Sequence, residues 1–243
     1  MPVVIETNGL SKTYRGPGGG TPALVDLTLS VEEGEIFGLV GPNGSGKTTT
    51  LKLLLGLLYP TAGEAKLFGK NPATDAGVRS RVGYLPEGPY FYEHLDAEEV
   101  LGFYAQLFQM PREQARERID ALLEQVDMAN RRHVRLGQCS KGMVQRIGLA
   151  QALINDPGLV LLDEPTSGLD PLGARDMRNH IVALKKQGKT VFLCSHILSE
   201  VERVCDRVAI LHQGRLLQVV RVNELTGSLE DHFVQLVEEA ERH

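Results

Sequence analysis

The chain has 243 residues, of which 42% are hydrophobic and 23% charged, an ordinary composition for a globular protein of one large or two small domains. Its formal net charge of −5 argues against nucleic acid as a partner, and no apolar stretch is long enough to span a bilayer. The first residues lack a secretory signal pattern, and three cysteines without C-x-x-C pairing are typical of a reducing compartment, so we expect a cytoplasmic protein.

Short apolar or alternating runs predict strands in the first part of the chain, at residues 3–7, 23–31, 36–40, 63–68 and 82–85. In the second of these runs, apolar and polar residues alternate as they do in half-buried antiparallel strands. The Gly- and Pro-rich segment 15–22 is typical of a flexible surface loop. A helix is expected at 49–58, after the glycine-rich segment that follows the third strand.

This glycine-rich segment matches the phosphate-binding pattern G-x-x-x-x-G-K-[ST] in its usual context, between a buried strand and a helix. Glycines let the backbone curl so that several N–H groups converge on one phosphate. Lys47 supplies a positive charge for the β and γ phosphates, and the Thr48 hydroxyl can ligate Mg²⁺. The sequence therefore predicts a nucleoside triphosphate site. The candidate residues are Gly41, Pro42, Asn43, Gly44, Ser45, Gly46, Lys47, Thr48 and Thr49.

The middle of the chain, about residues 96–126, changes to helical character. Asp96 with Glu99 three residues later is typical of a helix N-terminus, and Pro111 begins a second helix. Helix and strand then alternate at 141–154, 158–163, 171–187, 190–194, 197–204 and 207–213. This alternation predicts a parallel sheet with helices on its faces. The last segment, 223–243, has the pattern of an amphipathic helix that covers the core or a partner interface.

Two adjacent carboxylates, Asp163 and Glu164, end an apolar run that predicts a strand buried on both faces. Ligands of open parallel sheets bind beyond the carboxyl ends of the strands, so both side chains are expected at the edge that carries the phosphate loop. Asp163 would hold Mg²⁺, and Glu164 would orient or deprotonate the attacking water. Alternatively, Asp-Glu-Pro only ends the strand with turn-forming residues. The phosphate loop favours the catalytic interpretation.

The segment between these motifs indicates a family. Residues 139–146, Cys-Ser-Lys-Gly-Met-Val-Gln-Arg, begin a helix and resemble the signature motif of ATP-binding cassette (ABC) proteins. Residues 167–170, Ser-Gly-Leu-Asp, resemble the D-loop of that family, and His196 resembles its switch histidine. Tyr14 resembles the aromatic residue that stacks on adenine. All these motifs occur in the family's order, and the resemblance covers about residues 3–222.

The resemblance implies an α/β fold of the P-loop NTPase type. An ABC-type ATPase domain has a RecA-like parallel sheet core, an N-terminal antiparallel β subdomain and an inserted α-helical subdomain. We expect this domain at 1–222, with the helical subdomain inserted at about 88–157 and a C-terminal helical extension at 223–243. The implied activity is Mg²⁺-dependent hydrolysis of ATP.

Family roles transfer to the matching positions of this chain. Two copies, or one copy and a paired nucleotide-binding subunit, would hold two ATP molecules between them. Ser140 and Gly142 would reach the γ-phosphate bound by the other subunit, and Asp170 would lie beside the nucleotide. Taken alone, Ser140 could be only an N-cap and His196 only a structural histidine, but their motif context favours the functional roles. The implied catalytic residues are Lys47, Glu164 and His196.

Three positions depart from the family pattern. Lys141 and Met143 replace a common Gly and Gln in the signature, and we expect the Lys141 side chain to point to solvent rather than add charge near the phosphates. Glu87 stands where many members have a glutamine that senses Mg²⁺, water and the transmembrane partner. Its carboxylate can approach a metal but cannot donate an N–H when ionised, so we expect an altered Mg²⁺ dependence. These variants resemble ATP-binding subunits of exporters for drugs, polyketides, lipids or polysaccharides.

We therefore expect the ATPase subunit of an exporter, peripheral on the cytoplasmic face of the membrane, with the substrate path in separate permease subunits. Residues 89–92, Pro-Tyr-Phe-Tyr, and the helical insert are the expected docking surface for a permease helix, although these aromatics could equally belong to the subdomain core. Other cassette proteins fit less well. Members that act on ribosomes usually carry two cassettes in one chain, and only one is present here. Chromosome-maintenance members contain long coiled coils, and DNA-repair members contain zinc-binding cysteine clusters; this sequence has neither.

Overall fold

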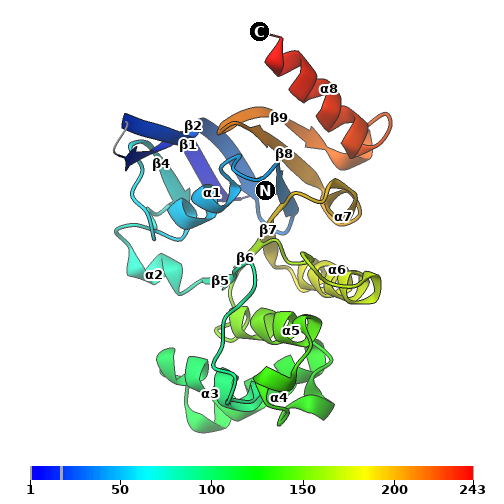
Figure 1. Ribbon diagram of the computed structural model, residues 1–243. Coiled ribbons are helices and arrows are strands. Elements are labelled where there is room, and N and C mark those ends of the chain that lie inside the picture. The colour runs from blue at the N-terminus through cyan, green and yellow to red at the C-terminus, as the bar shows by residue number, and fades with distance from the viewer. Residues whose placement is uncertain (1, 17–18, 243) are drawn as a thin grey trace.

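A computed structural model describes residues 2–16 and 19–242 and shows two sheets with helices packed around them (Figure 1). The strands are β1 (Val3–Gly16), β2 (Gly19–Glu32), β3 (Ile36–Val40), β4 (Ala62–Leu67), β5 (Val82–Leu85), β6 (Leu159–Asp163), β7 (Thr190–Ser195), β8 (Arg207–His212) and β9 (Arg215–Arg221). The helices are α1 (Lys47–Leu54), α2 (Ala76–Arg79), α3 (Ala97–Leu107), α4 (Arg112–Gln125), α5 (Lys141–Ala152), α6 (Pro171–Lys186), α7 (Leu198–Glu202) and α8 (Leu229–Glu241). Short 3₁₀ helices cover Ala129–Arg131, Leu136–Gln138 and Val222–Glu224.

The larger sheet has six strands in the order β5-β6-β7-β3-β8-β9. Its first five strands are parallel, and β9 pairs antiparallel with β8 at the edge. A separate antiparallel sheet, in the order β2-β1-β4, lies beside α1 at the upper left of the molecule (Figure 1). The expected α/β fold with an antiparallel β subdomain is thereby confirmed, with a mixed rather than a purely parallel main sheet.

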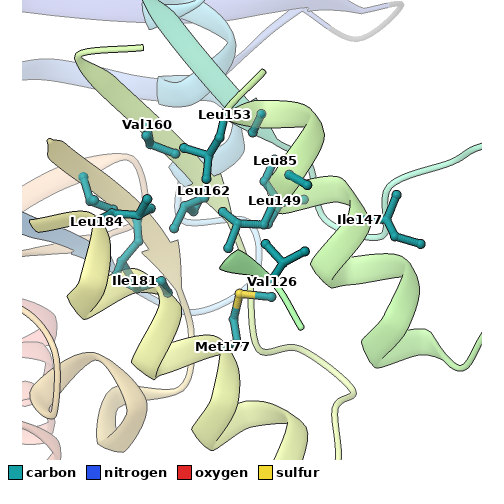
Figure 2. Packing of buried hydrophobic residues seen from close by; sticks show 14 of the residues in the cluster. Leu85, Val126, Ile147, Leu149, Leu153, Val160, Leu162, Met177, Ile181 and Leu184 are labelled. Atoms are coloured by element: carbon teal, nitrogen blue, oxygen red, sulfur yellow. The ribbon is translucent and has the colours of Figure 1, made fainter. Parts of the chain in front are cut away.

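The central strands are buried on both faces, which explains their continuous apolar runs. Successive side chains point to opposite faces and enter two different apolar clusters. In β6, Val160 and Leu162 join the cluster that contains residues of α3 to α7, whereas Leu159 and Leu161 join the one that contains residues of α1 and the smaller sheet. Figure 2 shows the first cluster, where Leu149 of α5 packs near Val160 and Leu162. A rigid sheet therefore supports the loops at its carboxyl edge.

The surface loop expected at 15–22 is largely strand instead. β1 and β2 both extend into this segment, where Arg15 pairs with Gly20. Residues 17–18 of the expected loop lie outside the described residues. The composition argument is wrong for the paired residues because an antiparallel ladder satisfies backbone groups whatever the side chains are.

Two further expectations need correction. The sequence reading omitted β9, although Gln213 and Gly214 form a two-residue turn after β8, with φ values of 46° and 78°. Positive φ at both positions favours a hairpin with glycine second, so this dipeptide was an available signal. The helix expected at 49–58 is α1, which starts and ends earlier. Gly56, in the left-handed region at φ 68°, stands just beyond its end.

The three helices α3, α4 and α5 pack together on the side of the main sheet far from α8 (Figure 1). The N-terminus expected at Asp96 is confirmed, because Asp96 and Glu99 form a reciprocal capping box at the start of α3. The helix expected over 223–243 is shorter than predicted, since α8 begins at Leu229. In residues 2–16 and 19–242, the structure has no helix that is both long and apolar enough to span a bilayer.

Candidate nucleotide-binding site

The phosphate loop connects β3 to α1 and packs tightly against neighbouring strands. A Cβ at Gly41 would lie 2.2 Å from the carbonyl oxygen of Leu211 in β8, so only glycine fits there. Gly46 caps α1 with φ 108°, and a Cβ at this position would lie 2.5 Å from the carbonyl oxygen of Ala23. The loop backbone therefore lies closely against β8 and β2 at these two glycines.

Lys47 is only 6% exposed and is surrounded by oxygen atoms. Its ammonium group donates hydrogen bonds to the carbonyl oxygens of Gly41, at 2.8 Å, and Pro42, at 3.2 Å. The same nitrogen lies 3.6 Å from Oε1 of Glu164, a buried ion pair. The lysine is thus held by the carbonyl groups of the turn it follows, beside the carboxylate of Glu164.

Asp163 ends β6 directly below the start of α1 and contacts it through Thr48. The Thr48 hydroxyl donates a hydrogen bond to Oδ2 of Asp163 at 3.2 Å. Oδ1 of Asp163 is buried and has no hydrogen-bond partner among the described residues. Burial raises the pKa of Asp163 to about 6; the Thr48 hydrogen bond opposes this shift, and the negative charges of Glu164 and Glu87 add to it. A buried carboxylate with one unpaired oxygen is strongly stabilised in its ionised form when a cation binds beside it.

Glu164 follows in a left-handed backbone conformation, with φ 50°, and its side chain is almost fully buried. Its Oε2 lies 2.8 Å from Nδ1 of His196. Ser195 Oγ and the backbone N–H of His196 donate to the same oxygen, each at 3.3 Å. The carboxylate is therefore fixed from one side. No role was predicted for Ser195 from the sequence, although it directly precedes His196.

Lys47, Thr48 and Glu164 line a cavity of about 250 Å³, whereas Asp163 and His196 are not part of its lining. It brings together the phosphate loop, the predicted base and Glu87, as expected from the motifs. Nothing in the sequence indicated that β2 contributes Ala23 to the wall. Gly41 and Ser45 are buried, whereas Pro42 is exposed. The cavity is lined by Ala23, Asn43, Gly44, Gly46, Lys47, Thr48, Thr49, Glu87 and Glu164.

Tyr14 lies beside this cavity rather than in its wall. It is 40% exposed, and its hydroxyl lies 3.4 Å from Oγ1 of Thr49, which does line the cavity. The ammonium group of Lys12 lies 5.6 Å from the centre of the Tyr14 ring. A planar ring of this kind, partly exposed next to a phosphate loop, is suited to stack on a base.

Ser140, Gly142 and Asp170 lie elsewhere, in a hollow of about 600 Å³ that shares no lining residue with the cavity in the described part of the chain. Ser140 caps α5 by accepting a hydrogen bond from the Met143 N–H at 3.3 Å. Asp170 caps α6 in the same way through the Gly173 N–H at 2.9 Å. One chain thus presents two helix N-termini in a place apart from its own phosphate loop.

Comparison with known proteins agrees with these motifs. A family described as "ABC transporter" matches residues 24–167. An uncharacterized ABC transporter ATP-binding protein of Nostoc sp. is 50% identical over 239 residues, which cover 96% of this chain and 71% of that relative. A fluoroquinolones export ATP-binding protein of Mycobacterium tuberculosis is 42% identical over 223 residues, which cover 91% of this chain and 72% of the relative.

A solved structure supports the same assignment. It is the dimer of an ATP-binding cassette in a post-hydrolysis state, bound to ADP and Pi. The two chains are 26% identical and superpose with a TM-score of 0.82, over 91% of this chain and all of the other. Sequence motifs, fold and site geometry therefore agree that the chain belongs to the ABC transporter family, as an ATP-binding subunit that hydrolyses ATP.

Proposed function

We propose that this ATPase subunit drives an exporter whose cargo passes through separate transmembrane permease subunits. The observation that carries the proposal is the position of Glu164, a buried carboxylate in the cavity wall, 3.6 Å from the ammonium of Lys47 and 2.8 Å from Nδ1 of His196. The relative named for fluoroquinolones export supports outward transport of drug-like molecules. The sequence departures at Lys141, Met143 and Glu87 support the same class.

Hydrolysis requires a water molecule to attack the γ-phosphorus in line with the leaving oxygen of the β-phosphate. Glu164 takes the proton of that water as general base. Ser195 and His196 hold Oε2 of the carboxylate, so that Oε1 faces the lysine side of the cavity. Lys47 would exchange the carbonyl oxygens of its own loop for phosphate oxygens and offset their charge. In this scheme His196 also contacts the γ-phosphate, and Tyr14 stacks on adenine.

The residues around Asp163 fit a magnesium ion. Mg²⁺ prefers hard oxygen ligands and keeps several waters. Thr48 and Asp163 would hold it, since one Asp163 oxygen is buried without a hydrogen-bond partner in the described chain. Glu87 is a further candidate contact. Residues 2–16 and 19–242 contain no group of three or more His, Cys, Asp or Glu able to hold a metal, so water and phosphate oxygens would complete its shell. When bound, the ion neutralises charge on the phosphates.

The separation of the two hollows supports a dimeric working form. The N-terminus of α5, at Ser140 and Gly142, offers free N–H groups and a favourable dipole to an anion. Because this end lies away from the cavity of its own chain, we propose that it completes the cavity of a second chain. Asp170 would be presented at the same interface. The solved dimer of a related cassette supports this arrangement.

The segment at residues 89–92 supports both roles weighed for it from the sequence. Tyr90 is 94% exposed and Tyr92 70% exposed, whereas Pro89 is buried and Phe91 packs against the core. The two exposed rings would meet a cytoplasmic helix of the permease, and the two buried side chains anchor them. This contact would place the chain on the cytoplasmic face of the membrane.

The proposed limits are 1–222 for the ATPase domain, about 88–157 for its helical insert and 223–243 for the extension.

The decisive experiment replaces the proposed base. Glu164→Gln keeps the size of the side chain and should still bind ATP, but phosphate release should fall by at least about a hundredfold. With Mg²⁺ and ATP, this variant should accumulate as a dimer in sedimentation velocity. Lys47→Ala serves as the control and should neither bind ATP nor dimerise. Turnover at the parent rate in Glu164→Gln would remove Glu164 as the base, and a variant that stays monomeric with ATP would remove the shared interface.

A further inference from the structure

An ion pair joins the two helices whose N-termini line the second hollow. Nη2 of Arg146, on α5, donates to Oδ2 of Asp176, on α6, at 2.7 Å. Both side chains are partly buried, with exposed fractions of 21% and 30%. Asp127, which follows α4, lies 4.0 Å from Nη1 of the same guanidinium. Such a charge-assisted bond is stronger and more directional than an ordinary hydrogen bond.

The pair stands at equivalent positions on the two helices. Arg146 comes six residues after Ser140, the N-cap of α5, and Asp176 comes six residues after Asp170, the N-cap of α6. At a rise of about 1.5 Å per residue, the ion pair lies roughly 9 Å along each helix from its capped end. All four residues line the same hollow. The bond between the two side chains therefore fixes how far one helix N-terminus lies from the other along the helix axes.

A second contact joins the same two segments closer to their ends. The side chain of Lys141, the first residue of α5, lies over Gly168 in the segment that precedes α6. A Cβ at Gly168 would be only 2.2 Å from the Lys141 nitrogen. The lysine is exposed, but its nitrogen lies against this segment and does not simply point to solvent. This contact therefore joins the two capped ends directly, in addition to the ion pair farther along the helices.

Apolar packing between these helices does not define their register by itself. Leu149 of α5 shares a cluster with Met177 and Ile181 of α6 (Figure 2). Hydrophobic burial is non-directional, so contacts of this kind tolerate small shifts along the helix axes. The bond between Arg146 and Asp176 has a preferred length and direction and opposes such shifts.

We propose that Arg146 and Asp176 are positioning residues that hold Ser140 and Asp170 as one rigid unit for contact with the nucleotide bound by a second copy. This inference rests on the proposed dimeric function. Neither residue touches the nucleotide in this scheme, and both act through the caps of their helices. Loss of the ion pair leaves each phosphate loop intact and misplaces the surface that closes over it.

The test measures dimerisation and nucleotide binding separately. In the Glu164→Gln background, Arg146→Met and Asp176→Asn should each raise the dimer dissociation constant with Mg²⁺ and ATP by at least about fivefold. The dimer dissociation constant of the double variant should not exceed the higher of the two single-variant values, because both changes remove the same contact. The affinity of dilute, monomeric protein for a fluorescent ATP analogue should stay within about twofold of the parent value, since Lys47 and its loop are untouched.

Arg178→Met is the matched control, because Arg178 of α6 forms an ion pair with Glu200 of α7 and lines neither hollow. It should leave the dimer dissociation constant at the parent value. Dimers of unchanged affinity in Arg146→Met, fully additive effects in the double variant, or an equal loss in the control would overturn the inference alone. A Glu164→Gln background that stays monomeric with ATP would overturn the proposed function together with it.

Discussion

At the scale of single residues, the nucleotide site holds charges that burial disfavours. Lys47, Asp163 and Glu164 are all nearly inaccessible, and Glu164 also has a left-handed backbone that a non-glycine residue rarely adopts. Local choices that oppose stability are typical of functional sites, where bound ligands compensate for them. Here a cation and a triphosphate would supply the compensating charges. Without them, the site should weaken the fold, and Asp163 provides a way to measure this.

We predict that Asp163→Asn stabilises the protein at neutral pH in the absence of nucleotide and metal. Because burial raises the pKa of Asp163 from its ordinary value to about 6, the folded chain binds this proton more tightly than the unfolded chain does. Between about pH 4 and pH 6, the folding free energy therefore becomes less favourable as the pH rises. Removing the carboxyl should recover about 1–2 kcal/mol at pH 7, after allowance for solvent screening.

Urea unfolding of parent and variant from pH 4 to pH 8 would measure this effect. The difference between the two stabilities should be small at pH 4, grow towards pH 6 and then stay constant. Burial also raises the pKa of Glu35, but this group is present in both proteins and cancels in the difference. A stability difference that does not change with pH would show that burial does not raise the pKa of Asp163.

Most residues that line the cavity belong to motifs that are recognisable in the sequence. Lys47, Glu164 and Glu87 follow a strand or loop that places them at one sheet edge, and all three line one cavity. Ala23 and Ser195 were not assigned roles. Ala23 contributes a backbone position on β2, which any small residue could occupy, and the contact of Ser195 with Glu164 exists only because β6 and β7 are neighbours. Such contributions follow from tertiary packing rather than from residue type.

At the scale of elements, strands buried on both faces were the easiest to locate. β3 and β5 match the predicted ranges because each is a short apolar run that follows a charged residue and ends at a glycine or proline. The edge strand β9 was missed, because Gln218 divides its apolar residues into two short pairs and its side chains are only half-buried or exposed. Backbone pairing also overrode composition in the hairpin of β1 and β2. Prediction thus failed where hydrogen bonding, not burial, decides the structure.

The first helix of the inserted region depends on its cap, and we predict that Asp96→Ala destabilises the protein by about 1 kcal/mol. Oδ1 of Asp96 accepts the Glu99 N–H, and Oε2 of Glu99 accepts the Asp96 N–H, both at 2.9 Å. Alanine removes one of these bonds and leaves an N–H at the start of α3 without a partner. Asp96→Asn keeps an acceptor there and should cost much less. Equal losses for both variants in urea unfolding would contradict a capping role.

At the scale of the whole molecule, one chain carries two parts of a site that do not meet. The phosphate loop and the capped end of α5 line separate hollows, and in the proposed dimer a second chain would bring the two together. The helical segment that carries α5 also follows the exposed aromatic residues Tyr90 and Tyr92. Closure around ATP would therefore move the proposed permease contact, because α5 links the interface to that region.

The last prediction concerns that contact. The double variant Tyr90→Ser/Tyr92→Ser should reduce the amount of this chain recovered with its permease in membrane fractions, because two large exposed rings are removed from the proposed interface. Stability of the isolated chain should change by no more than about 0.5 kcal/mol, as is usual for exposed positions. Tyr59→Ser, which removes a ring that is 69% exposed outside this segment, is the matched control. Full recovery of the double variant with membranes, or an equal loss in the control, would show that the permease binds another surface.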